Sequence, residues 1–206
     1  MSPICEVCFF YFFGDVLNKK GMATIKCLFV GEYGSGKSAL LRRIVDDVFE
    51  VTTPTVGVEF HLIEMPGVEH RITAWNLAGA PRFQDILSLY YKDSIVIFIV
   101  IDASVPTNIG KWVHRAEKLC RDAKIVLVFT KVDLKMHYST FDIEFMKSHY
   151  RSVFDSCMVS SKEMSSREIL ATIGKVFRTV QPRESCLNRT STHNDHRGTS
   201  LFCCFM

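Results

Sequence analysis

Short apolar runs alternate along this chain with longer stretches in which apolar and polar residues follow a helical period. Ile95–Ile101 is an unbroken apolar run, mostly β-branched, which predicts a central strand buried on both faces. The alternation is typical of an α/β fold in which helices flank a mostly parallel, six-stranded sheet. The expected strands are Thr24–Val30, Val56–Glu64, Glu69–Trp75, Ile95–Ile101, Ile125–Phe129 and Val153–Val159.

The expected helices are recognised by the spacing of their apolar residues. Such residues recur every three or four positions in Ile109–Arg121, and again in a stripe through residues 169–180. A further helix follows the first strand and continues to about Asp46, and Phe141–Tyr150 forms another. The turn Met65–Gly67 is expected to join the second and third strands into an antiparallel hairpin.

The length of 206 residues suits one well-cored domain, which we place at residues 22–181. Residues 1–21 form an N-terminal extension that we expect to be poorly ordered, and residues 182–206 form a polar, flexible tail. The formal charge of +3 comes without a dense basic block, so we expect no nucleic-acid partner. The scattered cysteines predict neither a metal site nor a disulfide framework.

A phosphate-binding loop is predicted at Gly31–Ser38, which matches G-x-x-x-x-G-K-[ST] between a predicted strand and a predicted helix. Its glycines let backbone amides wrap around phosphate oxygens, and the positive end of the helix adds attraction. Lys37 is expected to contact the β- and γ-phosphates, and the Ser38 hydroxyl to bind Mg²⁺. The expected phosphate-binding residues are Gly34, Ser35, Gly36, Lys37, Ser38 and Ala39.

The segment Thr130–Asp133 predicts a preference for guanine over adenine. The Asp133 carboxylate can accept hydrogen bonds from guanine N1 and its 2-amino group, whereas adenine would leave it unpaired. The aliphatic stem of Lys131 is expected to cover the base. Ser160, Ser161 and Lys162 follow the last strand, where a backbone amide can meet the guanine oxygen. This pattern disfavours a P-loop kinase or ATPase.

Over about residues 23–206 the chain resembles a Ras-superfamily small GTPase, nearest to the Rab branch. A Pro54-Thr55-Val56 triplet is more similar to Rho proteins, but no extra helix is inserted between Asp133 and Ser160. The resemblance implies a GTP/GDP switch whose switch regions bind effector proteins and an exchange factor. The segments that carry it are Val30–Leu40, Thr55–Phe60, Trp75–Gly79 and Tyr90–Tyr91.

Further site residues are implied by this resemblance. Thr55 would bind Mg²⁺ together with Ser38, and its amide and that of Gly79 would meet the γ-phosphate. Lys37, Thr55 and Gly79 are thus the catalytic residues that the family implies. Phe49 is expected to lie edge-on to the base, with Val48 as the alternative because the interval to Thr55 is one residue short.

Three positions depart from the family pattern around the γ-phosphate. Asn76 stands where the family has an aspartate that holds Mg²⁺ through water, so weaker metal binding is expected. Ala80 replaces the glutamine that orients the attacking water, unless Gln84 takes that role. Tyr33 occupies a place that is usually small and should obstruct an arginine finger. We therefore predict slow GTP hydrolysis.

The final residues, Cys203-Cys204-Phe205-Met206, predict lipidation. They fit C-a-a-X with farnesyl on Cys203, and they also resemble the Rab endings in which both thiols carry geranylgeranyl groups. The difference matters because one chain anchors weakly and two anchor stably. The resemblance implies a prenyl-binding escort protein and a location on the cytoplasmic face of intracellular membranes, with a cytosolic escort-bound pool.

The sequence supports two functions. The first is a prenylated Rab-like switch that recruits effectors in vesicle trafficking and hydrolyses GTP slowly. The second is a non-hydrolysing, guanine-nucleotide-bound interaction module, which Tyr33, Asn76 and Ala80 favour.

Overall fold

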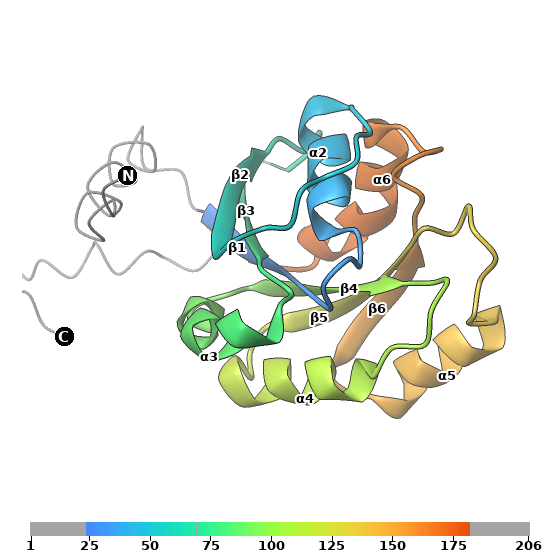
Figure 1. Ribbon diagram of the computed structural model, residues 1–206. Coiled ribbons are helices and arrows are strands. Elements are labelled where there is room, and N and C mark those ends of the chain that lie inside the picture. Colours follow the sequence, from blue (N-terminus) through green and yellow to red (C-terminus); the bar gives the residue numbers. More distant parts are fainter. Residues whose placement is uncertain (1–23, 69, 182–206) are drawn as a thin grey trace, which may run out of the picture.

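The computed structural model describes residues 24–68 and 70–181. Its six-stranded sheet has the order β2-β3-β1-β4-β5-β6, in which only β2 and β3 pair antiparallel (Figure 1). This confirms the predicted α/β fold. The strands are β1 (Thr24–Val30), β2 (Val58–Ile63), β3 (Arg71–Leu77), β4 (Val96–Asp102), β5 (Lys124–Thr130) and β6 (Val153–Met158).

Helices cover both faces of the sheet (Figure 1). One face carries α2 (Lys37–Asp46) and α6 (Ser166–Ile173), and α6 continues as the 3₁₀ segment η3 (Gly174–Arg178). The other face carries α3 (Gln84–Leu87), α4 (Ile109–Leu119) and α5 (Thr140–His149). Two 3₁₀ turns, η1 (Pro81–Phe83) and η2 (Ser88–Tyr91), flank α3.

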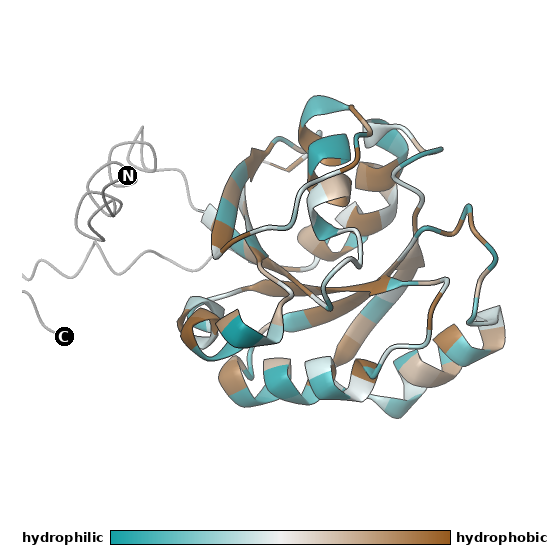
Figure 2. Cartoon of the chain, viewed as in Figure 1, coloured by the Kyte–Doolittle hydropathy of each residue, from teal (hydrophilic) through white to brown (hydrophobic). Residues whose placement is uncertain are grey.

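The centre of the sheet is buried because its strands are apolar on both faces. All seven residues of β4 are buried, and Figure 2 shows its ribbon mostly in the hydrophobic colour. The Phe29 and Phe98 rings stack between β1 and β4 with centroids 4.7 Å apart. Each fully buried side chain of this size contributes roughly 1.5–3 kcal/mol relative to exposure. This rigid centre holds the carboxyl ends of β1, β4 and β5, from which the loops of the site emerge.

Several sequence-based boundaries differ from the structure. The second strand begins at Val58, so Thr55 and Val56 belong to the preceding loop, and Glu69 lies outside the described residues. The stripe expected as one last helix is α6 followed by a tighter turn from Gly174, where a Cβ would lie 2.7 Å from the Met65 methyl group. The terminal segments 1–21 and 182–206 also lie outside the described residues, and with them Cys203 and Cys204.

Candidate functional site

A cavity of about 560 Å³ opens where the loops after β1, β3, β5 and β6 meet the N-terminus of α2. Its size suits a nucleotide-sized ligand. Ser35 and Ser160 do not line it but lie buried next to lining residues. The sequence-predicted site residues that do line it are Gly34, Gly36, Lys37, Ser38, Ala39, Phe49, Thr55, Gly79, Thr130, Lys131, Asp133, Ser161 and Lys162.

The phosphate loop requires glycine at two of its turns. Gly34 and Gly36 have φ angles of 77° and 88°, which side chains with a Cβ rarely adopt. Gly36 is the N-cap of α2 and makes no side-chain cap, so the first amides of this helix lack a capping side chain at the cavity. Backbone amides at a helix N-terminus attract phosphate oxygens. Thr130 steadies the loop by donating from its hydroxyl to the Ser35 carbonyl at 2.7 Å.

Lys37 folds back over the loop and is buried. Its ammonium group donates to the Gly31 carbonyl at 3.1 Å, the Glu32 carbonyl at 2.7 Å and the Ser35 hydroxyl at 3.2 Å. Burial lowers the pKa of Lys37 from 10.5 to about 8, although Glu32 acts in the opposite direction. The site therefore holds a cation whose charge is costly until an anion joins it.

This lowered pKa predicts that nucleotide affinity falls as the pH rises through about 8. Phosphate oxygens favour the charged amine, so binding takes up a proton wherever the free chain has lost it. Between pH 7 and pH 9 the protonated fraction of Lys37 falls about tenfold, and the Kd for GDP should rise by the same factor. Fluorescent-nucleotide titrations across this range measure the change.

The matched control for this titration is Lys37→Arg, because guanidinium keeps its charge throughout this range. Titration of the base affects both proteins equally, so the difference between their slopes belongs to Lys37. A wild-type Kd that follows the arginine variant from pH 7 to pH 9 would contradict the prediction.

The phosphate loop is also tied to α4 through Glu32. Its carboxylate oxygen Oε1 accepts a hydrogen bond from the Trp112 indole at 3.1 Å and lies 3.4 Å from the Lys111 ammonium group. On the other side of the loop, the backbone of Tyr33 lies against Gly79, where an added Cβ would be 2.5 Å from the Tyr33 nitrogen. The loop backbone is thus held from two sides.

Lys131 and Asp133 are positioned by polar contacts. Lys131, with φ of 57°, donates from its amine to the Gly34 carbonyl at 2.9 Å and to Asp102 at 2.5 Å. Burial would raise the pKa of Asp102, but hydrogen bonds from Lys131 and Ser104 outweigh it and lower that pKa. Asp133 accepts a 2.6 Å hydrogen bond from the Ser160 hydroxyl. The amine of Lys131 is therefore held by Gly34 and Asp102, while the residue lines the cavity.

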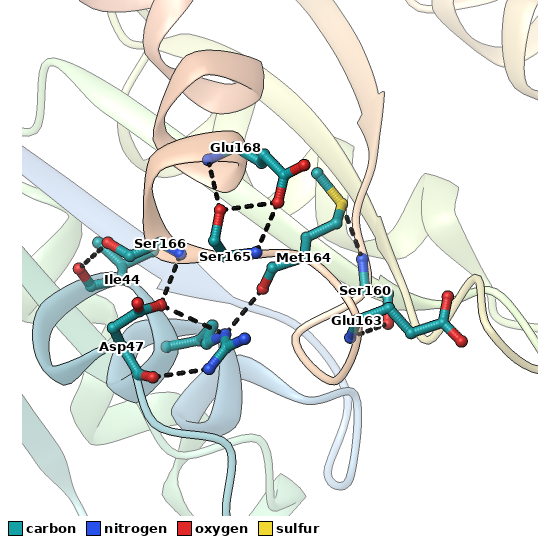
Figure 3. A network of polar contacts seen from close by, with 9 residues as sticks. Ile44, Asp47, Ser160, Glu163, Met164, Ser165, Ser166 and Glu168 are labelled. Carbon is teal, nitrogen blue, oxygen red and sulfur yellow. Dashed lines mark hydrogen bonds and ion pairs between the residues drawn. The ribbon is translucent and has the colours of Figure 1, made fainter.

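The loop that carries Ser160–Lys162 is fixed by its own turn and by the end of α2 (Figure 3). The Ser160 amide donates to the Met164 sulfur, and its hydroxyl oxygen accepts from the Glu163 amide. Ser165 forms a capping box with Glu168 at the start of α6. The Ser166 amide donates to the side chain of Asp47, the C-cap of α2, and the Ser166 hydroxyl donates to the Ile44 carbonyl within α2. These contacts fix the distance between the phosphate helix and the base-reading loop.

Ser38 and Thr55 bring two hydroxyl oxygens within 2.8 Å of each other. Adjacent oxygens around an octahedral Mg²⁺ lie about 2.9 Å apart, so this pair is spaced as two metal ligands should be. Asn76 lies beside them, wholly buried, and its amide nitrogen donates to Ser38 Oγ at 2.8 Å. Its Oδ1 atom has no hydrogen-bond partner in the described part of the chain. The residues fit a hydrated magnesium ion held with nucleotide phosphates.

Within residues 24–68 and 70–181, no three His, Cys, Asp or Glu side chains lie close enough together to hold a metal ion. Mg²⁺ commonly takes few protein ligands and completes its shell with phosphates and water.

Neither Ala80 nor Gln84 places a polar side-chain group in the main cavity. Ala80 has only a methyl group, and Gln84 is buried with its amide oxygen accepting from Arg115 at 3.2 Å. Gln84 lines a separate hollow of about 10 Å³ between α3 and α4, not the main cavity. Tyr33 lines the main cavity and is 64% exposed. In this arrangement Gln84 does not line the main cavity, and its side-chain oxygen is engaged by Arg115.

An aromatic cluster lies on β2, β3 and η2. The Phe60 and Trp75 rings meet edge to face at 5.1 Å, and Trp75 lies 5.8 Å from Tyr90. All three are half-buried, whereas Tyr91 is buried in the core. Nearby on the same chain segment, Ile86 and Leu89 are 65% and 75% exposed. Phe60, Trp75 and Tyr90 therefore form a half-buried aromatic cluster that Tyr91 does not join.

Sequence reasoning missed part of the cavity wall. Of the two candidates for the residue beside the base, Phe49 lines the cavity and Val48 does not, although both side chains are partly exposed. The loop Glu50–Pro54 and Leu134 line it as well, but their residue types carry no recognisable signal. Glu59 was also missed, and its contacts with Thr55 and Asn76 depend on strand register rather than on a motif.

Comparison with known proteins gives a consistent result. The family model "Ras of Complex, Roc, domain of DAPkinase" matches residues 26–133. The Ras-related protein Rab-18 of Caenorhabditis elegans is 30% identical over 152 residues, covering 69% of this chain and 74% of that protein. Mouse Rab-12 is 34% identical over 116 residues, 53% of this chain and 48% of its own length. SEC4 of Saccharomyces cerevisiae is 32% identical over 125 residues, 57% and 58% of the two chains.

Proposed function

Because the chain belongs to the Rab-like small GTPases of the Ras superfamily, we propose that it is a GTP/GDP switch in vesicle trafficking that hydrolyses GTP slowly. The observation that carries the proposal is the single cavity that joins the phosphate loop, Thr55, Gly79 and Asp133. Each of these groups has a separate task toward one guanine nucleotide.

Binding is expected to divide between the two ends of the nucleotide. The amides of the phosphate loop and the Lys37 ammonium group hold the phosphates, while Asp133 accepts from the guanine edge. Ser38 and Thr55 offer hydroxyl oxygens to Mg²⁺, which neutralises phosphate charge when bound. Phe49 contributes an aromatic wall beside the base, and the amides near Ser161 and Lys162 meet the guanine oxygen.

Slow hydrolysis is supported by the residue after Gly79, because Ala80 stands where the family has the glutamine that orients the attacking water. Ala80 supplies no donor or acceptor, and Gln84 is engaged with Arg115. Tyr33 at the mouth of the cavity adds bulk on the side from which an activating protein would insert an arginine. These features also favour the second candidate, a non-hydrolysing interaction module that keeps its nucleotide.

The switch function needs surfaces for partners and for a membrane. We extend the proposal to effector and exchange-factor binding through the loop containing Thr55 and the segment Pro81–Tyr91, next to the Phe60, Trp75 and Tyr90 cluster. None of the helices in the part of the chain that the structure describes is long and apolar enough to cross a bilayer. Membrane attachment is proposed through prenyl groups on Cys203 and Cys204, on the cytoplasmic face of an intracellular membrane. A second pool of the protein is proposed to stay in the cytosol, bound to an escort protein that covers the prenyl groups.

The decisive experiment compares the wild-type chain with Ala80→Gln. Both proteins are loaded with GTP and Mg²⁺, and single-turnover phosphate release is followed together with the nucleotide content after purification. We expect bound guanine nucleotide in both, slow release in the wild type and release faster by on the order of tenfold in the variant, because glutamine can orient the water.

The same measurement separates the two candidate functions. No detectable phosphate release from the wild-type chain over days, with GTP still bound, would favour the interaction module. Wild-type release at the rate of an ordinary Rab protein would contradict slow hydrolysis. Ala80→Ser is the control for added polarity, since its short hydroxyl cannot reach as far as glutamine.

A further inference from the structure

Glu59 lies next to the hydroxyl pair of Ser38 and Thr55. It belongs to the segment Thr55–Phe60 that carries the family resemblance, but the sequence assigns it no role. It stands in β2 directly opposite Asn76 of β3, and residues that face each other in antiparallel strands project from the same side of the sheet. Its Oε2 atom accepts from the Asn76 amide nitrogen at 2.6 Å. Its Oε1 atom accepts from the Thr55 hydroxyl at 3.1 Å. One carboxylate therefore touches both the buried amide and one expected metal ligand.

The hydrogen-bond directions suit metal binding by Thr55. A hydroxyl has one proton and two lone pairs. Because Thr55 donates its proton to Glu59, the Ser38 hydroxyl is the donor in the 2.8 Å contact between the two, and one Thr55 lone pair is left for a cation until the Ser38 proton turns away. A negative group that accepts a proton from a ligand also makes that ligand a better donor to the metal. Asn76 helps to orient Glu59, since an amide nitrogen can only donate.

The pairing also explains why an amide is tolerated at position 76. A carboxylate there would lie within hydrogen-bond distance of the Glu59 carboxylate, and two like charges so close are unfavourable before a metal binds. With Asn76 in β3, the site keeps one negative charge, which is the Glu59 carboxylate of β2. The orphan Asn76 Oδ1 atom, wholly buried, is what one expects of a site completed by a bound, hydrated group.

We propose that Glu59 supplies the negative charge of the magnesium site that Asn76 lacks. The proposal rests on the guanine-nucleotide binding proposed above and refines one expectation from the sequence. Asn76 by itself predicts weak Mg²⁺ binding, whereas Glu59 restores the electrostatic attraction from the neighbouring strand. Glu59 acts through Thr55 and Asn76, and it is a positioning and charge-supplying residue rather than a catalytic one.

The test measures metal dependence rather than hydrolysis. The full chain is loaded with fluorescent GDP, and the nucleotide dissociation rate is recorded over a series of buffered free Mg²⁺ concentrations. The midpoint of this curve reports metal affinity in the nucleotide complex. Glu59→Gln should raise the midpoint at least about tenfold, the usual cost of losing a group that supports a metal ligand. The dissociation rate in excess chelator should not change.

Two further variants make the result specific. The double variant Glu59→Gln with Asn76→Asp returns the carboxylate to the other strand and should restore the midpoint to within threefold of the wild type. Glu64→Gln is the matched control, because Glu64 is an exposed carboxylate directly after the other end of the same strand and does not line the cavity. It should leave the midpoint in place.

Three outcomes would overturn the proposal. In the first, Glu59→Gln binds GDP normally and its midpoint stays within twofold of the wild type. In the second, the midpoint rises but the double variant does not recover, which indicates a structural role for Glu59. In the third, the wild-type chain retains no guanine nucleotide at any Mg²⁺ concentration, and the proposed function fails with it. The first two outcomes leave the proposed function intact.

Discussion

Asp133→Ala should weaken GDP binding by on the order of 10³-fold, since two charge-assisted hydrogen bonds to guanine are lost together. Asp133 is well placed for these bonds because the Ser160 hydroxyl holds its Oδ1 atom at 2.6 Å from the side. Each carboxylate oxygen has two acceptor positions, so the Ser160 bond does not compete with the base. Isothermal titration with GDP and Mg²⁺ measures the loss.

The same contact is tested from the ligand side with inosine diphosphate, a GDP analogue that lacks the 2-amino group. The wild-type chain should prefer GDP over inosine diphosphate by at least about tenfold, the value of one charge-assisted bond. Asp133→Ala should bind the two nucleotides equally. Ser160→Ala is the matched control, because it removes only the supporting hydroxyl and should preserve the preference. A preference for GDP that survives in Asp133→Ala would show that the base is read elsewhere.

Gly79→Ala should lower the free energy of unfolding by about 3 kcal/mol, near the upper end of the usual cost of overpacking. The added Cβ would lie 2.5 Å from the Tyr33 nitrogen, 2.6 Å from the Glu32 carbonyl carbon and 2.7 Å from the Gly31 carbonyl oxygen. These are backbone atoms of the phosphate loop, so the loop must shift rather than a side chain rotate. Nucleotide affinity should therefore fall together with stability.

Thermal unfolding with and without GDP checks this prediction. A loss of 3 kcal/mol corresponds to a fall in Tm of about 6–12 °C for a domain of this size. Gly67→Ala is the control, since Gly67 has φ of 79° but nothing within 4 Å of an added Cβ. It should cost about 1 kcal/mol from backbone strain alone and leave GDP affinity unchanged. Equal effects of the two variants on GDP affinity would contradict the role of the close packing at Gly79.

The sequence predicts most of the sheet because the buried strands are continuous apolar runs. Ile95–Ile101 and Ile125–Phe129 are too short for buried helices and have the length of buried strands. The structure confirms both strands to within a residue at either end. The segment Pro81–Tyr91 was not recognised because its helical pieces are single turns, too short to show a period. In α5 the periodic residues Phe141 and Phe145 are exposed, and only Ile143 is buried. Periodicity there indicates a helix without indicating its buried face.

The candidate site is predictable where function depends on backbone shape or on one side chain. Gly31–Ser38 and Thr130–Asp133 are short, local patterns whose residues reach one cavity directly. The contacts of Glu59 were not predictable in the same way, because they depend on the pairing register of two strands. A shift of one residue in that register would turn Glu59 to the opposite side of the sheet. The same limit applies to Gln84, whose orientation is decided by Arg115 on a distant helix.

The double restraint on the phosphate loop has a kinetic consequence for Tyr33. With Glu32 tied to Trp112 and the Tyr33 backbone packed on Gly79, the loop itself has little freedom to open. The exposed phenol can still rotate about its own bonds, and exposed side chains do so in picoseconds to nanoseconds. The fraction of time that the phenol spends in a blocking rotamer therefore determines how far it obstructs an incoming arginine. The rate of a loop opening does not. The phenol would therefore lower the affinity of an activating protein for this chain, and it would not slow their association.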